Sequence, residues 1–217
     1  MKRTNIITVA IDSPAAAGAG TQAKLISNHY NLFYLDTGKC YRFIGKLKLK
    51  NPQIFSYSLI KKKMNNLKMR DLQSKSLLFD DVATEASAIA KDKKIRKIVS
   101  NFQKNCAYNP PKKYFGSCLD GRDITSIIMK DAMFKFYITA SVQTRAKRRF
   151  KEYKQLNKKI TYYDVLKSLK KRDKSDIQRK HGPLKKTSDS VLINTDKLSK
   201  TRAFKIIKKI MDKKLKL

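Results

Sequence analysis

Residues 13–21 read SPAAAGAGT, a stretch of small side chains with two glycines that ends in a hydroxyl. Small residues let backbone N–H groups converge on an anion, and the positive N-terminus of a following helix favours a phosphate there. The Thr21 hydroxyl is placed to bind Mg²⁺. Phosphate-binding loops of the form G-x-x-x-x-G-K-[ST] have glycine where this chain has Ser13, and lysine where it has Ala19. Taken alone, the stretch predicts either a phosphate cradle or a turn that packs a strand against a helix.

Residues 34–42, YLDTGKCYR, are suited to holding a nucleotide. Asp36 and Thr37 end an apolar run, and Tyr41 and Arg42 follow on the first turn of an expected helix. An aromatic ring can stack on a base while an arginine binds a phosphate. The same residues also fit a structural role, in which Asp36 or Thr37 caps the helix and Tyr41 packs against its neighbours. On this stretch alone the two interpretations are equally supported.

Arginine is concentrated in three further stretches of a chain in which lysine predominates. LDGRDIT (119–125) places Arg122, a fork of N–H donors for a phosphate, beside Asp123, an acceptor for an amine or hydroxyl. Arg172, Asp176 and Arg179 are spaced four and three residues apart and so share one face of a helix. A solvated helix with salt bridges explains most of the lysines, but arginine is the residue suited to bidentate phosphate binding. The third stretch supplies Arg145, Arg148 and Arg149.

The elements that must position these residues alternate along the chain. Apolar runs predict five strands, at residues 6–11, 32–36, 114–120, 134–140 and 190–196. Apolar residues at helical spacing predict a helix over 21–30, one long helix or two joined ones over 82–107, and a closing helix over 201–215, while 142–180 is a charged helical stretch. Strands alternating with helices indicate a mostly parallel α/β sheet. Each run ends at or next to a polar residue, and ligands bind at the carboxyl ends of strands in such sheets. These polar residues are Asp12, Asp36, Asp120, Ser141 and Asp196.

Composition sets the class of protein and of partner. The 217 residues are 41% hydrophobic, enough for one domain with a core. Lysine and arginine number 51 against 17 acidic residues, and the net charge of +34 favours anions such as nucleotides, nucleic acid or acidic membranes. Lysine is spread along the whole chain, so most of the excess is interpreted as solvated surface. Three cysteines without paired spacing indicate a reducing compartment, and no apolar stretch is long enough to span a membrane.

In their order along the chain, these stretches resemble the bacterial cytidylate kinases (CMP/dCMP kinases), which belong to the P-loop nucleoside monophosphate kinases. The family patterns are I-D-G-P-A-x-x-G-K-G-T, L-D-T/S-G-x-x-Y-R, D-G-R-D, S-x-x-x-R-A-x-R-R and R-D-x-x-D-x-x-R. The matching segments of this chain are IDSPAAAGAGT, LDTGKCYR, DGRD, SVQTRAKRR and RDKSDIQR. The resemblance runs from about Ile6 to the C-terminus. It implies a phosphotransferase that moves the γ-phosphoryl group of ATP, with Mg²⁺, to CMP or dCMP by in-line displacement.

The resemblance also implies the architecture: an α/β, three-layer P-loop NTPase fold with a five-stranded parallel sheet, a short NMP-binding insertion and a helical, arginine-rich lid. The insertion lacks the alternating Val/Ile segment of many bacterial members and is expected to be short and helical. We expect a cytoplasmic monomer that binds nucleotides, with no membrane and no specific nucleic-acid partner, although its charge favours non-specific nucleic-acid binding. The single kinase domain would span residues 1–217, with the core at 1–42, 86–144 and 181–217, the insertion at 43–85, and the lid and flanking helices at 145–180.

Carried over residue by residue, the resemblance implies three sets of site residues. The ATP phosphates would lie against Ser13, Pro14, Ala15, Ala16, Ala17, Gly18, Ala19, Gly20 and Thr21, with Mg²⁺ at Thr21. CMP would be held by Asp36, Thr37, Tyr41, Arg42, Ser87, Arg96, Arg122, Asp123, Arg172, Asp176 and Arg179. Among these, Ser87, Arg96 and Asp123 would recognise the cytosine edge. The catalytic charges would come from Arg122, Arg145 and Arg149.

Ala19 is the main departure from the family, because the lysine expected there neutralises charge on the β and γ oxygens of ATP. Substitution of its charge by Lys24 or Lys39 is a hypothesis. An alternative from a different class is a catalytically weak nucleotide- or RNA-binding protein on the same fold, supported by Ala19 and by the charge of +34. Retention of Thr21, Arg122 and the arginine-rich lid favours the enzyme. The missing histidine base is no objection, since the acceptor phosphate, with a second pKa of about 6, is largely ionised at neutral pH.

Overall fold

The computed structural model of the chain describes residues 6–156 and 159–217. Five parallel strands form one sheet in the order β2-β3-β1-β4-β5. All five strands predicted from the sequence are present, so the predicted parallel α/β architecture is confirmed. Their bounds are β1 (Ile7–Asp12), β2 (Leu32–Asp36), β3 (Gly116–Gly121), β4 (Phe134–Thr139) and β5 (Val191–Asn194).

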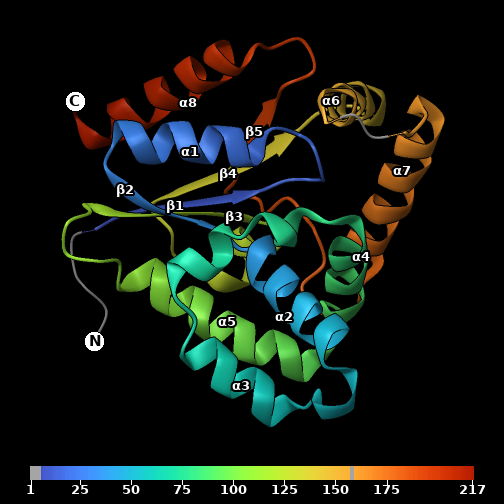
Figure 1. Cartoon of the computed structure of the whole chain (residues 1–217). Coiled ribbons are helices and arrows are strands. Elements are labelled where there is room, and N and C mark those ends of the chain that lie inside the picture. Colours follow the sequence, from blue (N-terminus) through green and yellow to red (C-terminus); the bar gives the residue numbers. More distant parts are fainter. Residues whose placement is uncertain (1–5, 157–158) are drawn as a thin grey trace.

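Helices cover both faces of the sheet and make three layers (Figure 1). Alternate side chains of a strand face opposite sides, and β1 follows this rule. Val9 and Ile11 pack with α1 (Ala19–His29) and α8 (Lys200–Leu215) on one face. Ala10, between them, packs with α2 (Gly38–Lys50) and α5 (Lys93–Tyr108) on the other. Two apolar cores, one on each face, therefore fix the sheet between its helices.

The segment between α2 and α5 is helical throughout. It contains the short 3₁₀ helices η1 (Pro52–Ile54), η2 (Met69–Gln73) and η3 (Lys75–Leu78), together with α3 (Tyr57–Asn65) and α4 (Asp80–Ile89). Where the sequence left one long helix or two joined ones open over 82–107, the structure has two. Asp92 separates them, because its carboxylate accepts hydrogen bonds from Lys94 N (2.7 Å) and Ile95 N (2.9 Å) and so caps α5.

The charged stretch 142–180 forms two helices, α6 (Val142–Gln155) and α7 (Tyr162–Gln178), which lie together at the edge of the molecule (Figure 1). A third, small apolar cluster joins them to the loop after β1: Ala15 packs with Ala146, Val165 and Leu169. One short helix, η4 (Ile124–Ile128), follows β3. Among the described residues, no helix combines the length and the apolar composition needed to cross a membrane.

Candidate active site

The register of the sheet brings three carboxylates to one edge. Asp36 at the end of β2 pairs with Asp120 of β3, and Asp12 at the end of β1 pairs with Gly121. The chain turns tightly there: Thr37 donates to the Asp120 carbonyl from its N–H (3.1 Å) and from its hydroxyl (2.7 Å). The predicted convergence of polar residues at the carboxyl ends of the strands is therefore present in the fold.

The loop of residues 13–18, called the phosphate loop below, joins β1 to α1. Ala16 has φ 62° and Gly18 has φ 94°, both in the left-handed region. Backbone that alternates into this region turns N–H groups toward one point and makes an anion-binding concavity. Gly18 precedes α1 and provides no side-chain cap, so the N–H groups of the first helical turn remain as donors. The loop has the geometry of a phosphate cradle.

Ala19 is buried, and its methyl group packs in the apolar core between the sheet, α1 and α8. Lys24 lies exposed on α1, one turn after Gly20. Lys39 is partly buried in the first turn of α2. The assignment of either lysine as the replacement for the missing lysine stays a prediction.

The carboxylates beside the phosphate loop have raised pKa values. Asp12 accepts from the N–H groups of Ile124 and Thr125 (2.8 Å each), but burial outweighs these bonds and raises its pKa to about 6. Burial, and then the carboxylate of Asp36, raises the pKa of Asp120 to about 7. Tyr34 donates its hydroxyl to Asp120 over 2.9 Å. An edge that holds several carboxylates with raised pKa values favours a bound cation.

The oxygen atoms at this edge fit Mg²⁺. A Cβ built on Gly20 would lie 3.6 Å from Asp120 Oδ2, so that carboxylate faces the start of α1, where Thr21 is exposed. Mg²⁺ is bound by oxygen ligands, usually one or two protein groups together with substrate phosphates and water. The Thr21 hydroxyl and the Asp120 carboxylate are donors of that kind.

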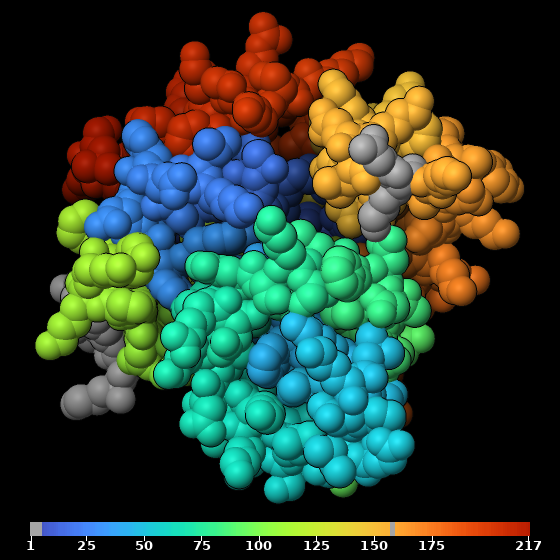
Figure 2. Space-filling model, viewed as in Figure 1, coloured from blue at the N-terminus to red at the C-terminus, as the bar shows by residue number. Residues whose placement is uncertain are grey.

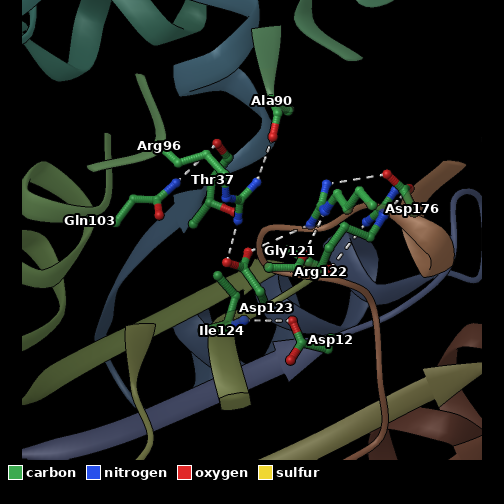
Figure 3. A network of polar contacts seen from close by, with 12 residues as sticks. Asp12, Thr37, Ala90, Arg96, Gln103, Gly121, Arg122, Asp123, Ile124 and Asp176 are labelled. Carbon is green, nitrogen blue, oxygen red and sulfur yellow. Dashed lines mark hydrogen bonds and ion pairs between the residues drawn. The ribbon is translucent and has the colours of Figure 1, made fainter. Parts of the chain in front are cut away.

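Three arginines surround the carboxylate of Asp176, and Figure 3 shows one of them, Arg122, beside it. Arg122 Nε donates to it over 2.8 Å and Arg179 Nη1 over 3.3 Å, while Arg172 Nε lies 3.9 Å away. Among the described residues, buried Arg172 Nε has no hydrogen-bond partner. Burial, then the charge of Arg122 and less strongly those of Arg42 and Arg149, lowers the pKa of Arg172 to about 10. The cluster therefore holds more positive charge than its carboxylate neutralises, which suits a phosphate.

Arg96 and Asp123 form a buried ion pair beside this cluster (Figure 3). Arg96 also donates to the Ala90 carbonyl over 3.0 Å, and its guanidinium lies 5.6 Å from the centre of the Tyr41 ring. Arg179 Nη2 lies 3.9 Å from Asp123 Oδ1 and thus links the pair to the arginine cluster. A hydrogen-bond donor, a carboxylate acceptor and an aromatic face meet here, as the recognition of a base edge requires.

The other predicted CMP residues lie around the pair and the cluster. Arg42 donates to the Leu77 carbonyl over 2.7 Å, so it is tied to the backbone of the 43–85 segment. Ser87 is partly buried on α4, one turn before Ala90. Thr37 is buried, and its carbonyl accepts a long hydrogen bond of 3.5 Å from Gln103, a contact that sequence reasoning missed.

The arginines of α6 have different surroundings. Arg145 is 5% exposed and forms two hydrogen bonds with Asp173, at 3.1 and 2.6 Å. Arg148 donates to the hydroxyl (3.0 Å) and the carbonyl (2.6 Å) of Thr195. Arg149 is more exposed, and it bonds Glu152 on its own helix over 3.0 Å. Sequence reasoning missed Asp173 and Thr195, although Asp173 lies inside a matched motif and Thr195 lies inside the fifth predicted strand, directly after the observed β5.

The 43–85 segment and the α6–α7 pair meet over one side of this edge. Figure 2 shows their surfaces in contact, and Tyr153 of α6 donates to Asp80 at the start of α4 over 3.4 Å. Arg149 stacks on Tyr153, with the guanidinium 4.9 Å from the ring centre. The contact between Tyr153 and Asp80 therefore also holds Arg149 near Arg42 and Arg172. A site enclosed from two sides can exclude water from its ligands.

Comparisons with known proteins agree with this geometry. A family model described as cytidylate kinase matches residues 9–214. The "Cytidylate kinase" of Bartonella tribocorum is 39% identical over 212 residues, which cover 96% of each chain. That of Clostridium botulinum strain Hall is 37% identical over 201 residues, 87% of this chain and 90% of the relative. An uncharacterized protein of Eubacterium ventriosum, solved as a crystal structure, has a TM-score of 0.56 at 19% identity and covers 95% of this chain and 98% of its own. This last likeness supports the fold alone.

Proposed function

The chain belongs to the cytidylate kinase family, and from this premise we propose that it transfers the γ-phosphoryl group of ATP to CMP and dCMP by in-line displacement. Membership of this family makes the chain a phosphotransferase. How the substrates bind and what each residue does are part of the proposal. The observation that carries it is the arginine cluster around Asp176, placed at the same sheet edge as the phosphate loop.

On the ATP side, the backbone of residues 13–21 would hold the phosphates. The positive φ values of Ala16 and Gly18 and the open N-terminus of α1 support that role. Thr21 and Asp120 would hold Mg²⁺, which supplies positive charge at the transferring group. The chain's own residues then have to align two phosphates and to screen their repulsion, since phosphoryl transfer needs little covalent chemistry from the protein.

On the CMP side, Arg96 and Asp123 would read the cytosine edge, with Ser87 nearby. Cytosine presents an amine donor at N4, which suits the Asp123 carboxylate, while the Arg96 guanidinium can donate to the neighbouring ring acceptors. Asp36, Thr37 and Tyr41 would border the nucleoside. Arg42, Arg122, Arg172 and Arg179 would surround the acceptor phosphate and the sugar, with Asp176 fixing the orientation of the arginines.

The test is a coupled assay of ADP release with CMP, dCMP and UMP on the wild type, on Ala19→Lys and on Ala19→Met. We expect turnover with CMP and dCMP to exceed that with UMP. Restoring a cation that acts on the transferring phosphoryl group should raise kcat by about tenfold or more in Ala19→Lys, by analogy with the larger effects of arginine fingers. Ala19→Met controls for side-chain length without charge, and it should not raise kcat.

The competing function is catalytically weak binding of nucleotides or RNA. Ala19 and the net charge of +34 favour it. If this function is correct, the wild-type protein should phosphorylate none of the three monophosphates and should bind RNA tightly, with an affinity that falls steeply as salt is added. That result would overturn the kinase proposal.

A further inference from the structure

Two carbonyl groups of the phosphate loop are held from outside by side chains. Arg145 Nη1 of α6 donates to the Ala15 carbonyl over 3.1 Å. The Thr195 hydroxyl, just after β5, lies 3.1 Å from the Ala17 carbonyl and 3.2 Å from the Thr139 carbonyl, so these two acceptors share its one proton. Arg148 of α6 donates to the same hydroxyl over 3.0 Å. We call Arg145, Arg148 and Thr195 the loop clamp. It reaches alternate carbonyls of the loop, at Ala15 and Ala17.

Four of the five N–H donors of Arg145 are engaged by groups of the protein itself. Its Nε donates to the Ala140 carbonyl over 2.9 Å, and its two terminal nitrogens form the bidentate pair with Asp173 at 3.1 and 2.6 Å. The side chain is 5% exposed. Turning the guanidinium toward a nucleotide would leave the carboxylate of Asp173, also largely buried, without its partner, which is costly in a protein interior.

The loop needs such support. Ala16 has φ 62°, a conformation that costs a residue with a Cβ about 1–2 kcal/mol. Residues in such conformations persist only where the surrounding structure over-determines them. In a trans peptide the N–H points opposite to the carbonyl, so holding the carbonyls of Ala15 and Ala17 from one side turns the N–H groups of Ala16 and Gly18 to the other side, where the anion would lie. The clamp therefore stabilises the one backbone shape in which the loop is a cradle.

We propose that Arg145 and Arg148 are positioning residues for ATP. Arg145 acts through the Ala15 carbonyl, and Arg148 acts through Thr195 on the Ala17 carbonyl. Arg149 is then the arginine of α6 that reaches the transferring phosphoryl group. This inference rests on the proposed kinase function and revises the role of Arg145 within it. The Arg149 side chain is 36% exposed, against 5% for Arg145, and it lies near Arg42 and Arg172, on the side of the acceptor phosphate. Because Ala19 supplies no cation, ATP binding depends more on the backbone donors that the clamp aligns.

The experiment measures binding of a fluorescent ATP analogue, binding of CMP, and kcat at saturating ATP. Thr195→Val keeps the shape of the side chain but removes the hydroxyl, and Arg145→Lys keeps the charge but loses the fork. Each should raise the Kd of the ATP analogue by about tenfold, the value of one good hydrogen bond, and leave the Kd of CMP and kcat within about threefold of wild type. Arg149→Ala should lower kcat about a hundredfold or more and leave ATP binding nearly unchanged. Lys147→Ala, exposed on the same helix, is the matched control.

The proposal is overturned if Thr195→Val binds the ATP analogue as tightly as wild type, or if Arg145→Lys lowers kcat like Arg149→Ala with ATP binding intact. Thermal melting checks that each variant is folded. Should Arg145→Lys not fold, Thr195→Val decides. Binding of the analogue needs no turnover, so a wild type that binds ATP without phosphorylating CMP would refute the proposed function and still test the clamp.

Discussion

Asp12 and Asp120 lie at the carboxyl ends of neighbouring strands, and folding raises the pKa of both carboxyl groups. Burial raises the pKa of Asp12 from 3.8 to about 6 and, with the charge of Asp36 next, that of Asp120 to about 7. A carboxyl group with a raised pKa stabilises the fold fully below its unfolded pKa, and this stability is lost as the pH rises through the folded value. As the pH rises from 3.8 to about 7, the ionisation of these two groups therefore lowers the free energy of unfolding of the ligand-free protein.

The variant Asp120→Asn isolates this contribution, because the amide oxygen can still accept the hydrogen bond from Tyr34. Urea unfolding of wild type and variant is measured at several pH values across that range. The difference in stability, wild type minus variant, should become less favourable to the wild type as the pH rises. Effects of the overall charge are common to both proteins and cancel. A difference that stays constant with pH would show that Asp120 is not protonated in the fold.

Residue types were easier to predict than the partners of each residue. The arginines of α6 were identified from the sequence, but their acceptors come from distant segments: Ala15 lies 130 residues before Arg145, and Thr195 lies 47 residues after Arg148. No local pattern encodes such a contact. The spacing of Arg172, Asp176 and Arg179 predicted a shared helix face. Arg172 and Asp176 do share a face of α7, whereas Arg179 follows the end of that helix in extended backbone. Its side chain still bonds Asp176.

At the scale of elements, boundaries were predicted where a specific residue sets them. β2 ends at Asp36 as expected, since Thr37 then turns back to bond Asp120. The third strand was predicted from 114 but begins at Gly116. A Cβ at that position would lie 1.8 Å from the Ile7 carbonyl, so only glycine fits where β3 approaches β1 so closely. Phe115 lies outside the strand, although its carbonyl accepts a hydrogen bond from Ile7 N over 3.0 Å.

The phosphate loop offers a test of stored strain at this scale. Ala16→Gly removes the steric cost of the positive φ at that position, whereas the unfolded chain gains some entropy. We expect a net gain of about 0.5–1 kcal/mol in the free energy of unfolding. Ala88→Gly, at an exposed position of α4, should lose about 1 kcal/mol, as glycine does within a helix. Urea unfolding measures both, and a loss of stability in Ala16→Gly would contradict the strain assigned to Ala16.

At the scale of the whole molecule, the sequence predicted the layers but not how the outer segments close on the sheet. The three-layer core follows from alternating apolar runs, each of which must bury its face. The contact between the 43–85 segment and the α6–α7 pair depends on single side chains such as Tyr153 and Asp80, which lie 73 residues apart. Charged, weakly patterned stretches carry no period that fixes such a packing, so the enclosure of the site became visible only in the fold.

The net charge of +34 makes a further prediction about the molecule as a whole. Self-repulsion of like charges destabilises the compact state, and salt screens it over a Debye length of about 10 Å at 0.1 M. The buried pairs Arg96–Asp123 and Arg145–Asp173 are screened much less. Added NaCl should therefore raise the melting temperature, by several degrees between about 10 mM and 500 mM, given the modest enthalpy of a domain of this size. A melting temperature that falls with NaCl would show that exposed ion pairs outweigh repulsion.

A charge-reversed surface separates this repulsion from function. Arg202, Lys205, Lys209 and Lys213 are exposed on α8, and none of them is assigned to ATP or CMP. Replacing all four by glutamate should reduce the salt dependence of melting and weaken binding of single-stranded RNA, because both arise from the summed charge. Phosphorylation of CMP should continue at about the wild-type rate, since the cradle and the arginine cluster keep their own charges. If kinase activity fell together with RNA binding, both would depend on the same surface, and the kinase site would not be separate from the general basic surface.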